Sequence, residues 1–267
     1  MDYDLAFIGA GNMAEAIVRS AVRGGVVEAG RVLAVDLSEQ RRAVFAGMGC
    51  AVSEATEDSV GGAGQVVLSV KPQVFGAVAM SLAGVLREGQ VVVSIMAGLS
   101  TAKIAEALGG GVKVVRVMPN TPVMVGHGMA GIALGEHAEP GDDATAYRLF
   151  EAGGKAVRVG ESLMDAVTAV SGSGPAYVFY LAEAMTAAAE KLGLGEHADV
   201  LVRQTILGAA ELLSSSDASP TELRRWVTSP GGTTEAAINA LTESSFVESV
   251  VEAIGRAEAR GRELGGA

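Results

Sequence analysis

The chain has 267 residues, of which 49% are hydrophobic, 4% aromatic and 19% charged, and its formal net charge is -11. This composition suits one large or two ordinary folded domains, and the acidic excess disfavours nucleic-acid binding, because neutralising phosphates requires Lys and Arg. No secretory signal or membrane span is expected. The single cysteine, Cys50, can form no intrachain disulfide, which fits a cytoplasmic location best. We expect its thiol to be buried and inert.

A glycine-rich turn follows the first apolar strand, Leu5–Ile8, and opens a helical pattern that runs to Val22. The turn reads Gly9-Ala10-Gly11-Asn12-Met13-Ala14. In a dinucleotide-binding unit the first glycine permits the tight turn, the second lets the backbone approach a pyrophosphate, and a small third residue lets helix and strand pack closely. The pattern therefore predicts a dinucleotide site over Gly9, Gly11, Asn12 and Met13.

Asp36 ends the second strand, Arg31–Val35, at the spacing of about 20 residues where an acid contacts the ribose 2′-hydroxyl of NAD. Arg41 and Arg42 follow on a helix that Ser38 is placed to cap. An arginine near this point can instead hold the 2′-phosphate of NADP, although a solvated helix face is the simpler interpretation of both arginines. The residues here leave both cofactors open.

Further apolar strands alternate with helical patterns up to residue 160. We expect them at Gln65–Val70, Gln90–Ile95, Val112–Val117, Gly128–Leu134 and Ala156–Val159. This alternation predicts a parallel sheet covered on both faces, with ligands beyond the carboxyl ends of the strands. Those ends carry Val70, Lys71, Pro72, Ala97 and Asn120. Lys71 is placed to reach a phosphate or carboxamide and Asn120 to bond near a nicotinamide; a solvated lysine and a turn residue are the alternatives.

Helical patterns alone follow Ser162, and we place a domain boundary near Gly160, between residues 1–160 and 161–267. Ser171-Gly172-Ser173-Gly174-Pro175 breaks the first of these helices, and Pro175 suits the first turn of the next. The helix expected at Glu196–Leu213 is apolar around much of its circumference, and the helix before it and the last helix each carry an apolar stripe. Such helices are usually buried on several sides, which predicts an isologous subunit interface.

The stretch Val227-Thr228-Ser229-Pro230-Gly231-Gly232-Thr233-Thr234 combines hydroxyl residues with two glycines before a helix expected at Thr234–Leu241. It can turn sharply and aim backbone N–H groups at one point, and a helix N-terminus favours an anion. We interpret it as a site for a small carboxylate, with a capped loop between helices as the alternative.

The remaining polar residues restrict the chemistry. His127, His137 and His197 are isolated from other ligand residues, so no metal site is expected. Neither glycine-rich motif carries an obvious general acid or base. Reduction of a carbonyl normally needs a proton donor, whereas a protonated imine needs only orientation, so an imine fits better as the group that accepts hydride.

Five motifs together resemble pyrroline-5-carboxylate reductases along essentially the whole chain. They are Phe7–Ala14, Val70–Gln73, Val117–Pro122, Ser171–Tyr177 and Val227–Thr234. The resemblance implies a Rossmann-type α/β N-terminal domain and an all-α C-terminal dimerisation domain. It also implies NAD(P)H-dependent reduction of 1-pyrroline-5-carboxylate to L-proline, the last step of proline biosynthesis, by a homodimer that in some members assembles further into decamers.

The resemblance also implies roles for individual residues. Ser229, Gly231, Gly232 and Thr233 would hold the substrate carboxylate, and Thr234 would act as the catalytic residue, with its hydroxyl against the ring nitrogen. Val70, Lys71, Pro72, Ala97 and Asn120 would lie along the cofactor. Asp36 departs from the Ser-Asn-Arg-like stretch of many members; family habit favours NADP, with NAD as the alternative.

Two other functions compete with this one. A β-hydroxyacid dehydrogenase needs a catalytic lysine on the helix that corresponds here to Pro175–Leu192, after the Ser171–Pro175 motif. This helix has only Lys191, at its far end. A non-catalytic nucleotide-binding protein would not need the hydroxyl-rich motif near the C-terminus.

Overall fold

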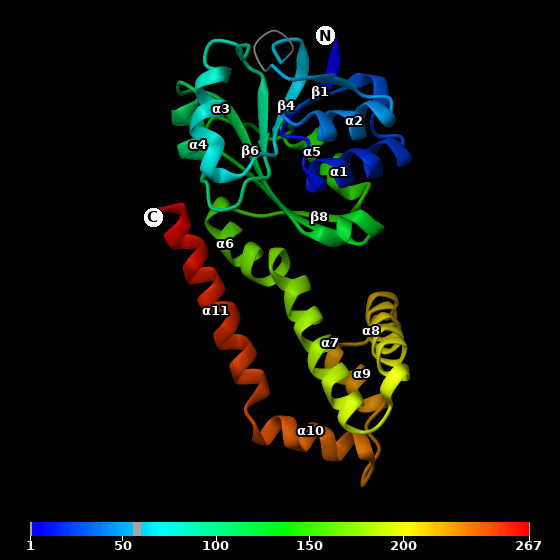
Figure 1. Ribbon diagram of the computed structural model, residues 1–267. Helices are drawn as coiled ribbons and strands as arrows, with labels where there is room; N and C mark the ends of the chain where they lie inside the picture. Colours follow the sequence, from blue (N-terminus) through cyan, green and yellow to red (C-terminus); the bar gives the residue numbers. More distant parts are fainter. Residues whose placement is uncertain (1, 56–59, 267) are drawn as a thin grey trace. The chain divides into compact units, whose positions relative to one another are not determined.

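The computed structural model describes residues 2–55 and 60–266 (Figure 1). Its contacts divide the chain into two compact units. The first, here called the sheet unit, comprises Met1–Ser173 and Ala257–Ala267; the second, the helical unit, comprises Gly174–Arg256. The compact units therefore divide later than the boundary at 160/161, which stays a prediction about functional domains.

Eight strands of the described residues form one sheet in the order β3-β2-β1-β4-β5-β6-β7-β8. Their bounds are β1 Tyr3–Ile8, β2 Val32–Val35, β3 Ala51–Ser53, β4 Ala63–Leu68, β5 Val91–Ser94, β6 Lys113–Pro119, β7 Gly128–Leu134 and β8 Gly154–Arg158. In the central pairs Leu5 lies opposite Val32 on one side and Gln65 on the other.

The predicted Rossmann-type α/β fold is confirmed, but the expectation of a wholly parallel sheet is wrong at β7. This strand pairs antiparallel with β6, whereas the other pairs are parallel. Only the short 3₁₀ turn Thr121–Val125 and its flanking residues join β6 to β7. A parallel connection needs a crossover of a dozen or more residues, so this short turn forces the chain to reverse.

Helices cover both faces of the sheet (Figure 1). They are α1 Asn12–Arg23, α2 Glu39–Gly47, α3 Phe75–Leu82, α4 Thr101–Ala107 and α5 Ala144–Glu151. One core contains Phe7, Ile17 and Phe45 beneath α1, α2 and α5, and the other contains Leu82 and Ile104 beneath α3 and α4. Strands buried on both faces explain why their sequences read as continuous apolar runs.

A short helical segment ends the main part of the sheet unit. It consists of a 3₁₀ turn at Glu161–Leu163, α6 at Met164–Val167 and a π-helical turn at Thr168–Gly172. The break predicted at Ser171–Pro175 is confirmed: the π turn ends at Gly172, Ser173 forms a bend, and a new helix begins at Gly174 with Pro175 in its first turn. In the π turn the Ser173 N–H donates to the Thr168 carbonyl at 2.8 Å.

The helical unit holds α7 Gly174–Lys191, α8 Ala198–Ser215, α9 Pro220–Trp226, α10 Thr233–Glu243 and the first half of α11 Phe246–Gly265. A capping box between Ser219 and Glu222 starts α9. Few of the described residues of this unit are buried, and these are small: Ala189, Ala198 and Val202. Large apolar side chains such as Phe179, Leu207 and Val251 are exposed. Within the described ranges, no helix combines the length and apolar character needed to cross a bilayer.

Candidate functional site

The residues predicted to contact a dinucleotide follow five neighbouring strands of the sheet unit. The glycine-rich turn follows β1, Asp36 follows β2, Lys71 follows β4, Ala97 follows β5 and Asn120 follows β6. These strands are parallel, so their carboxyl ends share one edge of the sheet. The strand order reverses around β1, and such a reversal is where open α/β sheets bind ligands. Contact with the cofactor itself remains a prediction for each residue.

The glycine-rich turn has the conformation that the fingerprint requires. Gly9 has a φ of 97°, and a Cβ built there would lie 2.8 Å from the Ser69 carbonyl oxygen, so both backbone angle and space select glycine. A Cβ on Gly11 would meet no atom within 4 Å, which leaves the start of α1 open to a ligand phosphate. The Ser69 hydroxyl donates to the Gly9 carbonyl at 2.6 Å, a contact that the sequence analysis missed.

Asp36 uses both carboxylate oxygens on backbone groups of the protein. The Ala10 N–H donates to Oδ2 at 2.7 Å and the Ser38 N–H donates to Oδ1 at 2.8 Å. The carboxylate therefore ties the end of β2 to the glycine-rich turn. This arrangement gives Asp36 a role in ordering the turn besides any contact with a ribose.

The simpler interpretation, in which Arg41 lies on a solvated helix face, is wrong. Its Nε donates to the Ala10 carbonyl at 2.5 Å and its Nη2 pairs with Glu15 at 2.8 Å. Arg42 also turns inward, donating to the Asp36 carbonyl at 2.7 Å. Hydrogen bonds from Arg19 and Arg41 lower the pKa of the Glu15 carboxyl. Ser38 caps α2 as predicted, its hydroxyl accepting from the Arg41 N–H.

Lys71 and Ala97 are both exposed at the carboxyl edge. Strand β4 stops at Leu68, so Val70, Lys71 and Pro72 form the turn after it, and Lys71 has the extended backbone expected before proline. The Lys71 side chain is therefore presented to solvent, where a phosphate or carboxamide can reach it.

The turn after β5 is braced by the end of α11, which belongs to the sheet unit. A Cβ on Gly98 would lie 3.3 Å from the Cβ of Leu264. The Lys103 ammonium donates to the carbonyl of Gly265 and, at 3.2 Å, to that of Gly266. A lysine on the last carbonyls of a helix stabilises that helix end.

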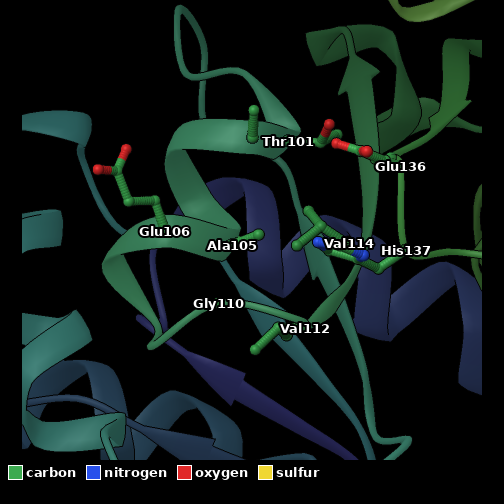
Figure 2. Close-up of a pocket in the computed structure, with 10 residues that line it drawn as sticks. Thr101, Ala105, Glu106, Gly110, Val112, Val114, Glu136 and His137 are labelled. Carbon is green, nitrogen blue, oxygen red and sulfur yellow. The ribbon is translucent and has the colours of Figure 1, made fainter.

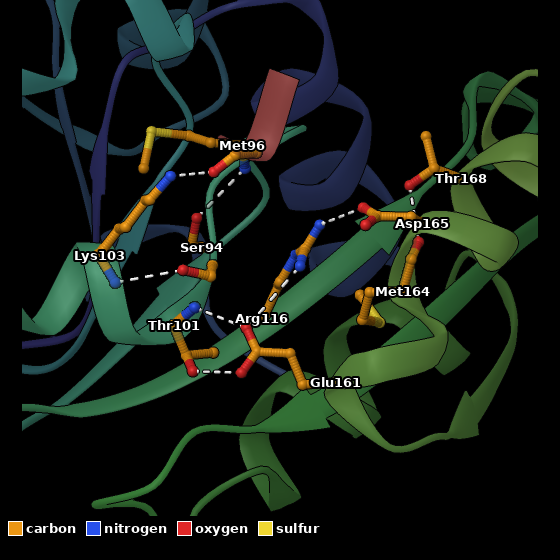
Figure 3. A network of polar contacts seen from close by, with 11 residues as sticks. Ser94, Met96, Thr101, Lys103, Arg116, Glu161, Met164, Asp165 and Thr168 are labelled. Carbon is orange, nitrogen blue, oxygen red and sulfur yellow. Dashed lines mark hydrogen bonds and ion pairs between the residues drawn. The ribbon is translucent and has the colours of Figure 1, made fainter. Parts of the chain in front are cut away.

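A polar network lies beneath the same part of the edge (Figure 3). Arg116 on β6 is buried and pairs with Asp165 at 3.2 Å and Glu161 at 3.7 Å. Glu161 also accepts from the Thr101 N–H at 2.6 Å and from its hydroxyl at 2.5 Å, which caps the start of α4. The network joins β6, α4 and the segment after Gly160.

The hydroxyl-rich motif forms a tight turn before α10, within the helical unit. Gly231 has a φ of 70°, and the Gly232 N–H donates to the Ser229 carbonyl at 3.0 Å. Helix α10 begins at Thr233, one residue earlier than predicted, with Gly232 as its N-cap and no side-chain cap. The Glu235 carboxylate accepts from the Gly231 N–H at 2.8 Å. The backbone N–H of Gly231, a residue predicted to hold the substrate carboxylate, is therefore already bonded to the protein's own Glu235 carboxylate.

A separate pocket of about 250 Å³ lies among α4, the start of β6 and the turn after β7 (Figure 2). Glu106 on α4 forms one wall, and Glu136 and His137 form another. All three side chains are exposed. In the part of the chain that the structure describes, no group of three His, Cys, Asp or Glu residues is arranged to hold a metal ion. Its three ionisable side chains are therefore open to solvent, unlike the few precisely placed polar groups of a specific ligand site.

Comparisons with known proteins agree with this architecture. Residues 161–264 match the family model for pyrroline-5-carboxylate reductase dimerisation, and residues 4–98 match that for NADP oxidoreductase coenzyme F420-dependent. The pyrroline-5-carboxylate reductase of Pseudomonas aeruginosa is 45% identical over 97% of this chain and 96% of its own. The chain belongs to the pyrroline-5-carboxylate reductase family.

Solved structures of pyrroline-5-carboxylate reductases carry the likeness over both units. That from Coxiella burnetii superposes with a TM-score of 0.92, at 35% identity, over 99% of each chain. That from Plasmodium falciparum, solved with NADP bound, has a TM-score of 0.87, at 29% identity, over 99% of this chain and 98% of its own. The family resemblance inferred from five short motifs is thus confirmed along the full length.

Proposed function

We propose that this protein reduces 1-pyrroline-5-carboxylate to L-proline with NADPH, the last step of proline biosynthesis. The observation that carries the proposal is the 45% identity with a pyrroline-5-carboxylate reductase over 97% of the chain. The open backbone at Gly11 and the glycine-selecting turn at Gly9 fit a dinucleotide.

The reaction needs little acid–base chemistry from the protein. The ring nitrogen of the substrate arrives protonated, NADPH supplies a hydride to the imine carbon, and the products are proline and NADP. The protein has to bind the carboxylate, orient the ring and keep the hydride donor within reach. This division of labour is consistent with the lack of an acid–base pair in either glycine-rich motif.

We assign the carboxylate to the turn that contains Ser229, Gly231, Gly232 and Thr233, and the ring nitrogen to the hydroxyl of Thr234. The first-turn N–H groups of α10 have no side-chain cap, which leaves donors for an anion. Gly231 already donates to Glu235, so we expect the substrate carboxylate either to use the remaining donors or to displace Glu235.

The helical unit supports assembly of more than one subunit. Its match to a dimerisation model and its exposed apolar side chains favour a homodimer. We also propose decamers built from dimers, and a cytoplasmic location in keeping with a single buried cysteine. Size-exclusion chromatography with light scattering tests the assembly: a species of only 27.0 kDa would contradict it.

The activity is tested by following oxidation of NADPH and NADH, separately, with pyrroline-5-carboxylate. A 3-oxo acid, which a β-hydroxyacid dehydrogenase would reduce to the 3-hydroxy acid, serves as the alternative substrate. Reduction of the 3-oxo acid without reduction of the imine would favour a β-hydroxyacid dehydrogenase. We expect turnover of the imine alone, with NADPH as the better donor.

The substitution Thr234→Ala tests the substrate site. Loss of one hydroxyl contact should lower kcat/KM about tenfold, because a hydrogen bond contributes about 1 kcal/mol or more. The Kd for NADPH should stay close to that of the wild type. Thr242→Ala is the matched control, because Thr242 lies on the same helix and its hydroxyl donates only to the Ile238 carbonyl in that helix. A large loss of NADPH binding by Thr234→Ala would mean that the residue is misassigned.

A further inference from the structure

The peptide group between Gly9 and Ala10, in the glycine-rich turn, is held at both of its polar ends. The Ser69 hydroxyl donates to the Gly9 carbonyl at 2.6 Å. At the other end, the Ala10 N–H donates to Asp36 at 2.7 Å. Ser69 follows β4 and Asp36 follows β2, the two strands that flank β1. Residues from both neighbouring strands therefore fix this peptide group.

The next peptide group, between Ala10 and Gly11, is held by Arg41 on α2. The Arg41 Nε donates to the Ala10 carbonyl at 2.5 Å. In a planar trans peptide group the N–H points away from the carbonyl oxygen. Through its contact with the carbonyl, Arg41 therefore also fixes the direction of the Gly11 N–H.

The Gly11 N–H belongs to the part of the turn that is predicted to meet the pyrophosphate. Gly11 is the N-cap of α1, and a Cβ built on it would meet no atom within 4 Å, so the backbone here borders open space. Within the described ranges, no protein group accepts a hydrogen bond from this N–H. The donor is thus oriented and unused before a ligand binds, which is the state that favours tight binding of an anion.

Arg41 is in turn held by α1. Its Nη2 pairs with Glu15 at 2.8 Å, and the two side chains are only 25% and 24% exposed. A guanidinium presents its donors as a rigid fork, so one residue can bind the Ala10 carbonyl and the Glu15 carboxylate together. The Glu15 N–H also donates to the Gly11 carbonyl at 3.0 Å. One side chain therefore joins the turn to both α1 and α2.

We propose that Arg41 and Ser69 are positioning residues for the dinucleotide, which orient the backbone donors of the glycine-rich turn before the cofactor arrives. Both act through the turn, so they strengthen binding of the pyrophosphate, which NADPH and NADH share. An arginine that held the 2′-phosphate directly would strengthen binding of NADPH alone. The inference deepens the proposed function and rests on its cofactor contact at Gly11.

The first test substitution is Arg41→Met, which keeps an unbranched stem and removes the donors. Arg19→Met is the matched control, because Arg19 pairs with the same Glu15 carboxylate at 2.9 Å. Both variants remove one positive charge from Glu15, but only Arg41→Met releases the Ala10 carbonyl. We expect the Kd values of NADPH and NADH to rise together, about tenfold, in Arg41→Met and to change less than about twofold in Arg19→Met.

The second test substitution, Ser69→Ala, releases the Gly9 carbonyl without changing any charge. Here too the Kd values of NADPH and NADH should rise by a similar factor, about fivefold, because one hydrogen bond that orients the turn is lost. Ser81→Ala is the matched control, since the Ser81 hydroxyl donates at 2.9 Å to the Val78 carbonyl within α3. This control should leave both Kd values unchanged.

Steady-state kinetics separate positioning from a loss of folded protein. With pyrroline-5-carboxylate as substrate, Arg41→Met and Ser69→Ala should raise KM for the nucleotide and leave kcat at saturating nucleotide unchanged. A reduced fraction of folded enzyme would instead lower kcat and leave KM unchanged, and that result would contradict the proposal. Circular dichroism of the ligand-free variants measures the folded fraction directly.

Three results of the Kd titrations would overturn the proposal. They are a loss confined to NADPH in Arg41→Met, equal losses in Arg41→Met and Arg19→Met, and unchanged Kd values in Arg41→Met or in Ser69→Ala. The titrations need no turnover, so a wild-type protein that binds NADPH without reducing the imine would refute the reductase function alone. A wild-type protein that binds neither nucleotide would overturn both proposals.

Discussion

Arg116 provides a quantitative test of what holds the segment after Gly160 in place. The substitution Arg116→Met keeps a long apolar stem in the core and removes the charge. The arginine side chain is only 7% exposed, whereas its partners Glu161 and Asp165 are 28% and 24% exposed. Removing one partner of a buried ion pair costs about 3–5 kcal/mol, because the other charge is left uncompensated. Both carboxylates reach water here, so we expect a smaller cost of about 2–3 kcal/mol.

That loss should be visible in thermal unfolding. For a unit of this size, each 1 kcal/mol lowers Tm by about 2–4 °C, which gives an expected decrease of roughly 4–12 °C by differential scanning calorimetry. The control is Arg256→Met, which removes an i,i+4 pair with Glu252 in which both side chains are mostly exposed, and which should change stability by about 0.5 kcal/mol or less.

A double substitution separates electrostatics from packing. Adding Asp165→Asn to Arg116→Met removes one of the two uncompensated carboxylates, so the double variant should regain part of the lost stability. If Arg116→Met unfolds at the wild-type temperature, the ion pairs contribute nothing net. If the double variant is less stable by the sum of the two single losses, the coupling inferred from the distances is absent.

Three further predictions concern charges and the thiol. The substitution Asp36→Ser should weaken NADPH and NADH to a similar degree, about tenfold in Kd titrations, because it removes the carboxylate that accepts from the Ala10 N–H; a change confined to one cofactor would mean that Asp36 faces the ribose. Glu15 has a folded-state pKa below its ordinary value of 4.5, so it stabilises the fold at pH values above 4.5 and loses this contribution as the pH falls through the lowered pKa. Urea unfolding of Glu15→Gln and wild type should therefore differ at neutral pH and converge once the pH has fallen below the lowered pKa of Glu15. Burial raises the pKa of the Cys50 thiol above 9.0, so it should react with a thiol reagent much more slowly in the native protein than in urea, and equal rates would contradict the burial.

Local sequence patterns were sufficient for much of the sheet unit. Apolar runs between turn residues located the strands to within a few residues, because strands buried on both faces must be apolar throughout. The glycine-rich turn was also predictable, since the φ of 97° at Gly9 and the nearby Ser69 carbonyl exclude a side chain. Both features depend on residues that are close in sequence or on a repeated pattern of burial.

Features that depend on distant partners were not predictable. Arg41 looks like a surface helix residue, and only the folded chain brings the Ala10 carbonyl to its Nε. Asn120 looks like a free polar group at a strand end, yet its partners Met129 and Ser171 lie on other elements. Periodicity and residue type carry no information about which backbone group will meet a long or buried polar side chain in the fold.

The Gly9–Ala14 and Val227–Thr234 motifs share a feature that explains why acidic residues lie beside predicted anion-binding sites. Asp36 accepts from the Ala10 N–H of the first motif, and Glu235 accepts from the Gly231 N–H of the second. In each motif a carboxylate of the protein itself accepts from one backbone N–H of the turn. The first-turn N–H groups of the following helix remain available for a ligand. Fixed donors of this kind are already oriented when the ligand arrives. The acid beside the fingerprint is therefore explained by the needs of the turn.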